Sequence, residues 1–309
     1  MRRSGRRLAV VALGGNALLR RGEPPDIHTE RHNVEVATAA IASLADDHDL
    51  VITHGNGPQV GLLALQSAAL GHDPDPLDVL DAASEGMIGY LLEQGLRNAL
   101  PGRDVAVLLT QVVVNADDPA FRAPTKPIGP VYAESQARAL ASERGWTIAP
   151  DGDGYRRVVP SPEPRRIVEI EQIRLLLDAG AIVICVGGGG IPVVAGERDE
   201  LRGVEAVIDK DLSTAVLAEQ LGASMLLMLT DVPAVERDWG TARATAIRSI
   251  TPHELSRMRF AAGSMQPKTE AARRFVQATG AVAAIGALAE AQAIVHGTAG
   301  TIVAHGNPG

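Results

Sequence analysis

Short, almost continuously apolar runs alternate with amphipathic helical patterns along nearly the whole chain. Runs of this kind are typical of strands buried on both faces of a parallel sheet, and they occupy residues 8–13, 50–53, 105–114, 181–186, 225–229, 281–285 and 301–304. Helical patterns lie between them at residues 29–45, 77–100, 169–179, 212–221 and 268–278. Three of these patterns are followed by the glycine at which helices commonly end, namely Gly180, Gly222 and Gly280. The alternation predicts an α/β fold, a three-layer αβα sandwich with a mainly parallel central sheet.

One stretch interrupts this alternation. Between residues 116 and 166 proline and charged residues become frequent, and only one helical pattern and two short strand patterns, at residues 146–149 and 156–159, remain. We interpret residues 116–166 as a small lobe inserted into a single domain that spans residues 1–309.

Composition excludes several classes of partner. The formal net charge is −8 and basic residues cluster only in the N-terminal tail, so the chain lacks the basic face of a nucleic-acid-binding protein. No segment approaches the roughly 20 apolar residues of a membrane span. The basic tail precedes only six apolar residues, too few for a secretion signal, and a single cysteine, Cys185, excludes an internal disulfide. We therefore expect a cytoplasmic protein with no nucleic-acid or membrane partner.

Lysine is rare in this chain. Of 29 basic residues only three are lysines, and the other 26 are arginines. The lysines are Lys126, in a proline-rich segment of the lobe, Lys210, between two aspartates, and Lys268, after Gln266-Pro267. Lysine carries a compact ammonium, whereas arginine carries a rigid planar fork. General solubility does not explain the choice, and the three lysines are candidate functional residues.

Glycine clusters follow three predicted strands. They are Gly14-Gly15-Asn16, Gly55-Asn56-Gly57 after His54, and residues 187–190. At the carboxyl edge of an α/β sheet, glycine lets backbone N–H groups approach an anion. A glycine after a strand can equally form an ordinary turn, and asparagine is a common turn residue. The three clusters together favour a large anionic ligand or two adjacent ones, although neither GxxxxGK[ST] nor a GxGxxG fingerprint is present.

Other motifs, present and absent, favour phosphoryl transfer. Asp209-Lys210-Asp211 precedes a predicted helix; it could be a helix cap with a solvated ion pair, or a lysine held ready for a phosphoryl group. The chain lacks HExxH, GxSxG and any Cys/His cluster, and no acidic pair is spaced as a dedicated metal site. Phosphoryl transfer depends mainly on positioning and positive charge, which glycine clusters and lysines supply.

Over nearly its whole length the sequence resembles the carbamate kinases of the amino acid kinase superfamily. The resemblance is carried by residues 12–17, 54–61, 124–130, 186–192, 207–211 and 263–268. The segment Pro-Thr-Lys-Pro-Ile-Gly-Pro at residues 124–130 is the part that distinguishes carbamate kinases from other superfamily members. The resemblance implies the amino acid kinase fold and reversible transfer between ATP plus carbamate and ADP plus carbamoyl phosphate, with Mg²⁺ accompanying the nucleotide.

The resemblance also implies roles for individual residues. Catalytic positions are Lys126, Lys210, Asp211 and Lys268. Positions contacting phosphate and carbamate are Gly14, Gly15, Asn16, Gly55, Asn56 and Gly57. Positions on the nucleotide side are Gly188, Gly189, Asp209, Thr230, Asp231, Val232 and Met265. No dedicated metal ligand is implied, and Gln266 departs from the glycine that many relatives carry.

Several points stay open at the level of sequence. The same fold could serve a non-catalytic nucleotide-binding regulator, or a sister kinase that acts on another small acid. The resemblance implies a homodimer; residues 87–100 are a candidate interface, and a helix buried within one chain would have the same pattern. It also implies a catabolic role in arginine metabolism that forms ATP, while the sequence leaves open the direction of flux and whether carbamoyl phosphate comes from arginine, agmatine or purine breakdown. The lobe is interpreted as a lid that excludes water from carbamoyl phosphate.

Overall fold

The computed structural model describes residues 6–19, 23, 26–69, 75–198, 200–260 and 265–306. Its centre is an eight-stranded sheet with the strand order β15-β17-β16-β12-β1-β2-β9-β3. The strands are β1 (Arg7–Leu13), β2 (His48–His54), β3 (Val105–Val107), β9 (Ile182–Ile184), β12 (Met225–Thr230), β15 (Ser249–Ile250), β16 (Val282–Ala287) and β17 (Thr301–Val303). All neighbouring pairs are parallel except β16 with β17. The predicted mainly parallel sheet is confirmed.

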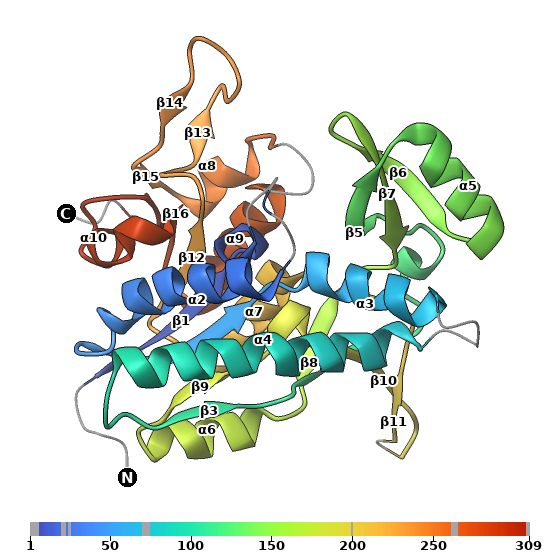
Figure 1. The fold of residues 1–309 in the computed structure, drawn as a ribbon. Coiled ribbons are helices and arrows are strands. Elements are labelled where there is room, and N and C mark those ends of the chain that lie inside the picture. Colours follow the sequence, from blue (N-terminus) through green and yellow to red (C-terminus); the bar gives the residue numbers. More distant parts are fainter. Residues whose placement is uncertain are drawn as a thin grey trace.

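Helices cover both faces of this sheet (Figure 1). One face carries α1 (Gly15–Leu18), α2 (Ile27–Ala42), α4 (Leu77–Ala99) and α10 (Ala291–Val295). The other carries α6 (Ile170–Asp178), α7 (Lys210–Leu221), α8 (Pro252–Ser256) and α9 (Met265–Thr279). Successive side chains of a strand point to opposite faces, so Val10 packs in one core and Val11 in the other. This explains why the strand runs are apolar throughout, and it confirms the three-layer αβα sandwich.

The apolar run at residues 105–114 was predicted as one strand, and this prediction is wrong. The chain leaves the central sheet after Val107 and enters a second sheet, of order β11-β10-β4-β8, at Gln111. The members of this sheet are β4 (Gln111–Val114), β8 (Pro164–Ile167), β10 (Ile191–Ala195) and β11 (Leu201–Gly203). At the break, the Thr110 N–H donates to the Glu85 carboxylate of α4. Both pieces are apolar, so composition does not mark the change of sheet.

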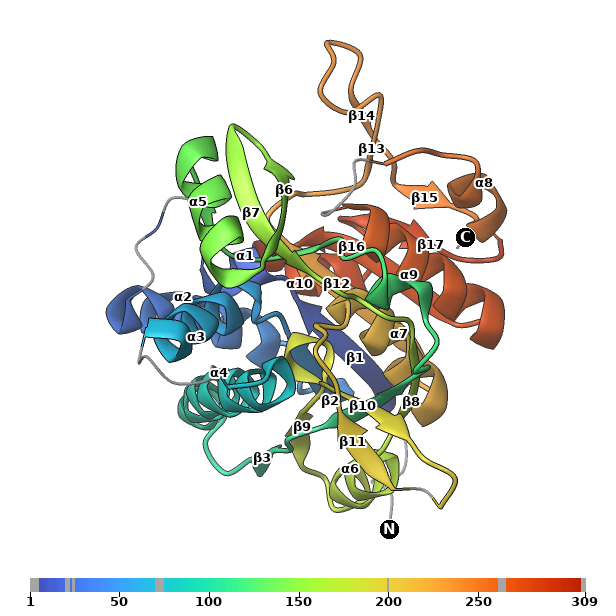
Figure 2. The same cartoon turned by 90° about the vertical axis from the view of Figure 1, so that its right-hand side faces the viewer.

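The lobe forms a separate small sheet of order β5-β7-β6 (Figures 1 and 2). It consists of β5 (Lys126–Tyr132), α5 (Glu134–Arg144), β6 (Thr147–Asp151) and β7 (Gly154–Val159), flanked by the short helix η1 (Pro119–Phe121) and by β8. The proline-rich β5 was not expected to be a strand. It pairs only with β7 and is therefore an edge strand, where proline removes no needed hydrogen bond.

The lobe is seated on α3 (Gly57–Ala69) by backbone-to-backbone packing. A Cβ atom on Gly61 of α3 would lie 2.0 Å from the Cα of Gly129 in β5. Gly129 itself has φ +72°, within a register shift of the β5–β7 pair. Only glycine at both positions allows this approach, and it places β5 beside the edge of the central sheet.

The remaining elements are short. A hairpin of β13 (Glu236–Arg237) and β14 (Thr245–Ala246) projects from the body, while η2 (Gly187–Gly189) and η3 (Leu288–Glu290) are single turns. Within the described ranges, none of the helices has the length and apolar character needed to cross a membrane.

Candidate active site

The start of α7 organises the site. Asp209 is the N-cap, and its Oδ1 accepts hydrogen bonds from the N–H groups of Asp211 at 2.9 Å and Leu212 at 3.3 Å. An aspartate at this position satisfies donors that have no partner inside the helix. Lys210 and Asp211 therefore stand in the first turn of α7, which begins two residues before the start predicted at Leu212.

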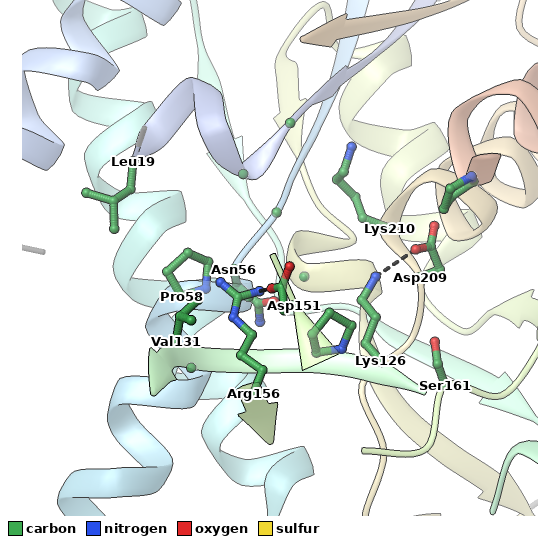
Figure 3. A pocket seen from close by; sticks show the side chains of 18 of the residues that line it. Leu19, Asn56, Pro58, Lys126, Val131, Asp151, Arg156, Ser161, Asp209 and Lys210 are labelled. Atoms are coloured by element: carbon green, nitrogen blue, oxygen red, sulfur yellow. Dashed lines mark hydrogen bonds and ion pairs between the residues drawn. The ribbon is translucent and has the colours of Figure 1, made fainter. Parts of the chain in front are cut away.

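All three lysines of the chain reach the carboxylates of this segment. Asp211 Oδ1 lies 2.6 Å from Lys210 Nζ, and Asp211 Oδ2 lies 2.9 Å from Lys268 Nζ. From the lobe, Lys126 Nζ lies 2.6 Å from Asp209 Oδ2 (Figure 3). The lysines are separated by more than fifty residues along the chain, and they converge on one three-residue segment.

Burial and charge set the protonation of this cluster. Burial lowers the pKa of Lys210 to about 8, against the opposing effect of Asp211. Burial would raise the pKa of Asp211, but the two ammonium groups hold it well below its usual value. Burial would lower the pKa of Lys268, yet Asp211 keeps it above its usual value. Around neutral pH the shared carboxylate is ionised and keeps two closely spaced ammonium groups charged.

A cleft of about 1310 Å³ opens over this cluster, between the sheet edge and the lobe. Its volume exceeds the range of typical single-ligand pockets, so two ligands fit side by side. The predicted site residues that line it are Gly14, Gly15, Gly55, Asn56, Gly57, Lys126, Gly188, Asp209, Lys210, Asp211, Thr230 and Lys268. The lobe contributes further lining residues, among them Tyr132, Asp151 and Arg156.

Some predicted site residues lie elsewhere. Among the described residues, Gly189, Asp231, Val232 and Met265 are outside the cleft lining. Gly189 accepts a hydrogen bond from Ser213 Oγ behind the start of α7, and Met265 packs against the apolar core. Asn16 belongs to α1, but its side chain is outside the described part of the structure; residues 263–264 of the predicted motif before Lys268 are outside it as well.

The three glycine clusters follow β1, β2 and β9, and Thr230 ends the neighbouring strand β12. The order β12-β1-β2-β9 brings Thr230, Gly14, Gly55 and Gly187 to the same carboxyl edge. Two of the amides are already engaged there, because Gly14 N–H donates to the Leu229 carbonyl and Gly55 N–H to the Leu13 carbonyl. Gly15 and Gly57 instead begin α1 and α3, and the first N–H groups of a helix are free to bind a ligand.

The turn at residues 187–190 packs directly against Asn56. Gly188 has φ +69°, and a Cβ atom there would lie 2.2 Å from Asn56 Nδ2. Both the backbone conformation and the space require glycine. Gly188 is therefore both a turn residue and part of the cleft lining, so the two interpretations of this glycine cluster do not exclude each other.

A buried polar row on α4 supports this region, and sequence reasoning missed it. Asp81 and Ser84 accept hydrogen bonds from Asn56 Nδ2 at 2.8 Å each. Glu85 accepts from the N–H of Gly187 at 2.8 Å and of Thr110 at 3.1 Å. Burial raises the pKa of Asp81 well above its usual value and that of Glu85 to about 8. Asp81, Ser84 and Glu85 interrupt the apolar stripe of this helix. Polar residues at positions expected to be buried could therefore have been identified from the sequence as candidates for a supporting role.

His54, which stands beside a glycine cluster in the sequence, is fully buried. Burial lowers its pKa to about 4, so its ring is neutral, and Nδ1 lies 3.2 Å from the Gly55 carbonyl oxygen. This histidine therefore adds no positive charge to the cleft.

The sequence matches the model of the amino acid kinase family over residues 7–286. The chain belongs to the amino acid kinase family. Its relatives include the carbamate kinase of Haemophilus influenzae, 54% identical over 94% of this chain and 95% of the relative. A solved structure of the Giardia lamblia carbamate kinase bound to citric acid superimposes with a TM-score of 0.91 at 39% identity, covering 97% and 99% of the two chains. The same enzyme bound to AMP-PNP gives a TM-score of 0.88 at 39% identity, covering 97% and 99%.

Kinases transfer a phosphoryl group from or to a nucleotide, and a divalent metal ion commonly accompanies the nucleotide phosphates. The side chains of the cleft can therefore be compared with those of a metal site. Within the described ranges, no group of three or more His, Cys, Asp or Glu side chains is placed to hold one. The carboxylates of Asp209 and Asp211 already pair with lysines. Mg²⁺ commonly binds through phosphate oxygens and water with few protein ligands. The amino acid kinase site therefore fits a metal that enters with the nucleotide phosphates.

Proposed function

We propose that the protein catalyses reversible phosphoryl transfer between ATP and carbamate, giving ADP and carbamoyl phosphate. The high identity to carbamate kinases over almost the full length supports this function. The observation that carries it is the convergence of Lys126, Lys210 and Lys268 on the start of α7. Phosphoryl transfer requires concentrated positive charge more than covalent catalysis.

In the direction of ATP formation, the bond between phosphorus and the carbamoyl oxygen breaks. A bond from phosphorus to an oxygen of the ADP β-phosphate forms, and carbamate leaves as an anion. Lys210 and Lys268 neutralise charge on the transferring group, and Asp211 fixes the distance between their ammonium groups. The positive end of α7 adds to this field. Mg²⁺ on the nucleotide phosphates would supply further positive charge.

The two ligands occupy different parts of the cleft. Gly14, Gly15, Asn16, Gly55, Asn56 and Gly57 border the carbamate side, and Lys126 reaches it from the lobe. The proposed nucleotide side comprises Gly188, Asp209 and Thr230, which line the cleft, together with Gly189, Asp231, Val232 and Met265, which lie outside its lining. Those residues that lie outside the cleft lining would act there by supporting the loops that contact nucleotide.

The lobe acts as a lid in this proposal. Strand β5 of the lobe carries Lys126 at the cleft, and closure of the lobe would keep water from carbamoyl phosphate. The enzyme is proposed to be cytoplasmic and to work as a homodimer through the region of residues 87–100, in arginine catabolism.

A coupled assay tests the proposal by detecting ATP formed from ADP and carbamoyl phosphate. ATP formation that depends on both substrates is expected. Folded protein that forms no ATP would indicate a non-catalytic regulator, and faster ATP formation from another acyl phosphate would indicate a sister kinase.

A further inference from the structure

The side chain of Asn56 is held in one orientation at the cleft. It is 2% exposed and lines the cleft beside Gly188 (Figure 3). Its Nδ2 donates to Asp81 Oδ1 and to Ser84 Oγ, both at 2.8 Å. Both N–H bonds of the amide are thereby used on the side of α4.

The hydroxyl of Ser84 fixes the direction of this amide. Ser84 Oγ donates its single hydrogen to the Asp81 backbone carbonyl at 2.9 Å. Its oxygen can therefore only accept a hydrogen bond from Asn56, which requires the NH₂ group of the amide to face α4. The bond to Ser84 fixes this orientation whether or not Asp81 is ionised, and burial raises the pKa of the Asp81 carboxyl group well above its usual value.

The carbonyl oxygen Oδ1 of Asn56 is consequently left on the other side, toward the cleft that the residue lines. Within the described part of the chain no hydrogen bond engages this atom. When a ligand displaces water from the cleft, an acceptor at its wall is costly to leave unpaired. The atom that Asn56 offers to a ligand is thus a hydrogen-bond acceptor. The contacts to anionic oxygens that the resemblance implied would instead need a donor.

This acceptor and the lysine cluster belong to the lining of the same cleft. The charge of Lys126 acts on Asp81, the residue bonded to Asn56. Gly188 touches Asn56, and a Cβ atom on the next residue, Gly189, would lie 3.2 Å from the backbone nitrogen of Lys210. An ammonium group and a carbonyl acceptor within one small region match a ligand that carries both anionic oxygens and an N–H donor.

Building on the function proposed above, we propose that Asn56 Oδ1 accepts a hydrogen bond from the amino group of carbamate and of carbamoyl phosphate. Asn56 is thereby the residue that selects carbamate over carboxylic acids, and Ser84 is the positioning residue that sets its orientation. Acetyl phosphate has nearly the same shape but carries a methyl group there, which leaves Oδ1 unpaired. Sites built to bond an N–H reject analogues that lack it.

The test compares kcat/KM for carbamoyl phosphate with kcat/KM for acetyl phosphate in ATP formation. In Ser84→Ala and Asn56→Ala we expect the ratio to fall at least about tenfold, because one good hydrogen bond has this effect. The loss should lie in the carbamoyl phosphate reaction, with the KM for ADP unchanged. Ser67→Ala is the matched control, since it removes a buried serine hydroxyl of α3 that bonds Asp75, and its ratio should equal that of the wild type.

Because both substrates are measured on the same preparation, any unfolded fraction cancels in the ratio. Equal losses for the two substrates would overturn the proposal and leave Asn56 with a structural role. For the wild type, phosphonoacetamide should inhibit at least about tenfold more tightly than acetonylphosphonate, which lacks the amino group. Equal inhibition, or equal use of both acyl phosphates by the wild type, would refute only the selectivity. A wild type that makes no ATP from any acyl phosphate would refute the proposed function as well.

Discussion

At the scale of single residues, the chain places a lysine only where a point charge meets one carboxylate. Lys210 and Lys268 share the two oxygens of Asp211, and Lys126 takes one oxygen of Asp209 while the other caps α7. Removing one partner of a buried pair leaves an uncompensated charge. We therefore expect substitution of any residue in this cluster to disturb the site, even where the substitution preserves the charge.

Lys210→Arg should lower kcat about 100-fold or more, although the charge is kept. The planar fork of arginine cannot place one nitrogen where Nζ lies, 2.6 Å from Asp211 Oδ1, in a buried site. The measurement is steady-state ATP formation, with circular dichroism and thermal unfolding to verify the fold. Near-normal kcat in a folded variant would contradict the role of Lys210.

The cluster also predicts a pH dependence. If Lys210 must be charged, kcat/KM should decline as the pH rises through its pKa of about 8. Asp211 raises that pKa, so Asp211→Asn should move the alkaline limb to lower pH, in addition to lowering the rate. Profiles from about pH 6 to about pH 9 measure this. Asp104→Asn removes an exposed charge and should leave the midpoint in place; an unmoved midpoint in Asp211→Asn would exclude Lys210 as the titrating group.

At the scale of elements, the site is assembled from the ends of strands and the starts of helices. The turn after β9 is the most constrained of these parts, since Glu85 of α4 bonds its first amide and Asn56 fills the space beside Gly188. The buried polar residues of α4, Asp81, Ser84 and Glu85, therefore support the cleft wall. The other buried positions of this helix are apolar.

Gly188→Ala should reduce the free energy of unfolding by about 3 kcal/mol or more, through left-handed strain and the clash with Asn56. Gly222→Ala is the control: Gly222 has φ +65° but no atom within 4 Å of a Cβ there, so only the backbone cost of about 1–2 kcal/mol applies. Urea unfolding of both variants measures the difference. Equal losses would show that packing against Asn56 has no energetic consequence.

At the scale of the whole molecule, a lobe is placed above the carboxyl edge of a conventional αβα sandwich. It is seated through the Gly61 and Gly129 backbones and linked across the cleft by Lys126 and Asp209. A second link joins Glu163, beyond β7, to Arg274 of α9. The lobe thereby contributes both a wall of the cleft and the ammonium group of Lys126.

Lys126→Ala should raise the KM for carbamoyl phosphate about tenfold or more and lower kcat, since a charged hydrogen bond to the ligand is lost. Arg138→Ala is the control on the same lobe, because Arg138 forms an exposed pair with Glu134, and such pairs contribute little. Initial-rate kinetics over both substrates measure the effect. Unchanged turnover together with unchanged carbamoyl phosphate affinity in Lys126→Ala would remove the lobe from the mechanism.

Periodicity and local motifs were enough to predict the layered sheet, the glycines that follow its strands and the three lysines. These features depend on near neighbours in the chain: an apolar run indicates burial on both faces, and a glycine after it indicates a turn at the edge of the sheet. The edge position itself follows from parallel pairing, which brings the ends of β12, β1, β2 and β9 together.

Tertiary structure alone decided which atoms face one another. The change of sheet after Val107, the edge strand β5 and the orientation of the Asn56 amide all depend on contacts between segments distant in sequence. Asp81, Ser84 and Glu85 look like an interruption of a helix until Asn56, Thr110 and Gly187 pack against them. The physical reason is that a polar group reveals its role only through its partner, and partners here are set by packing.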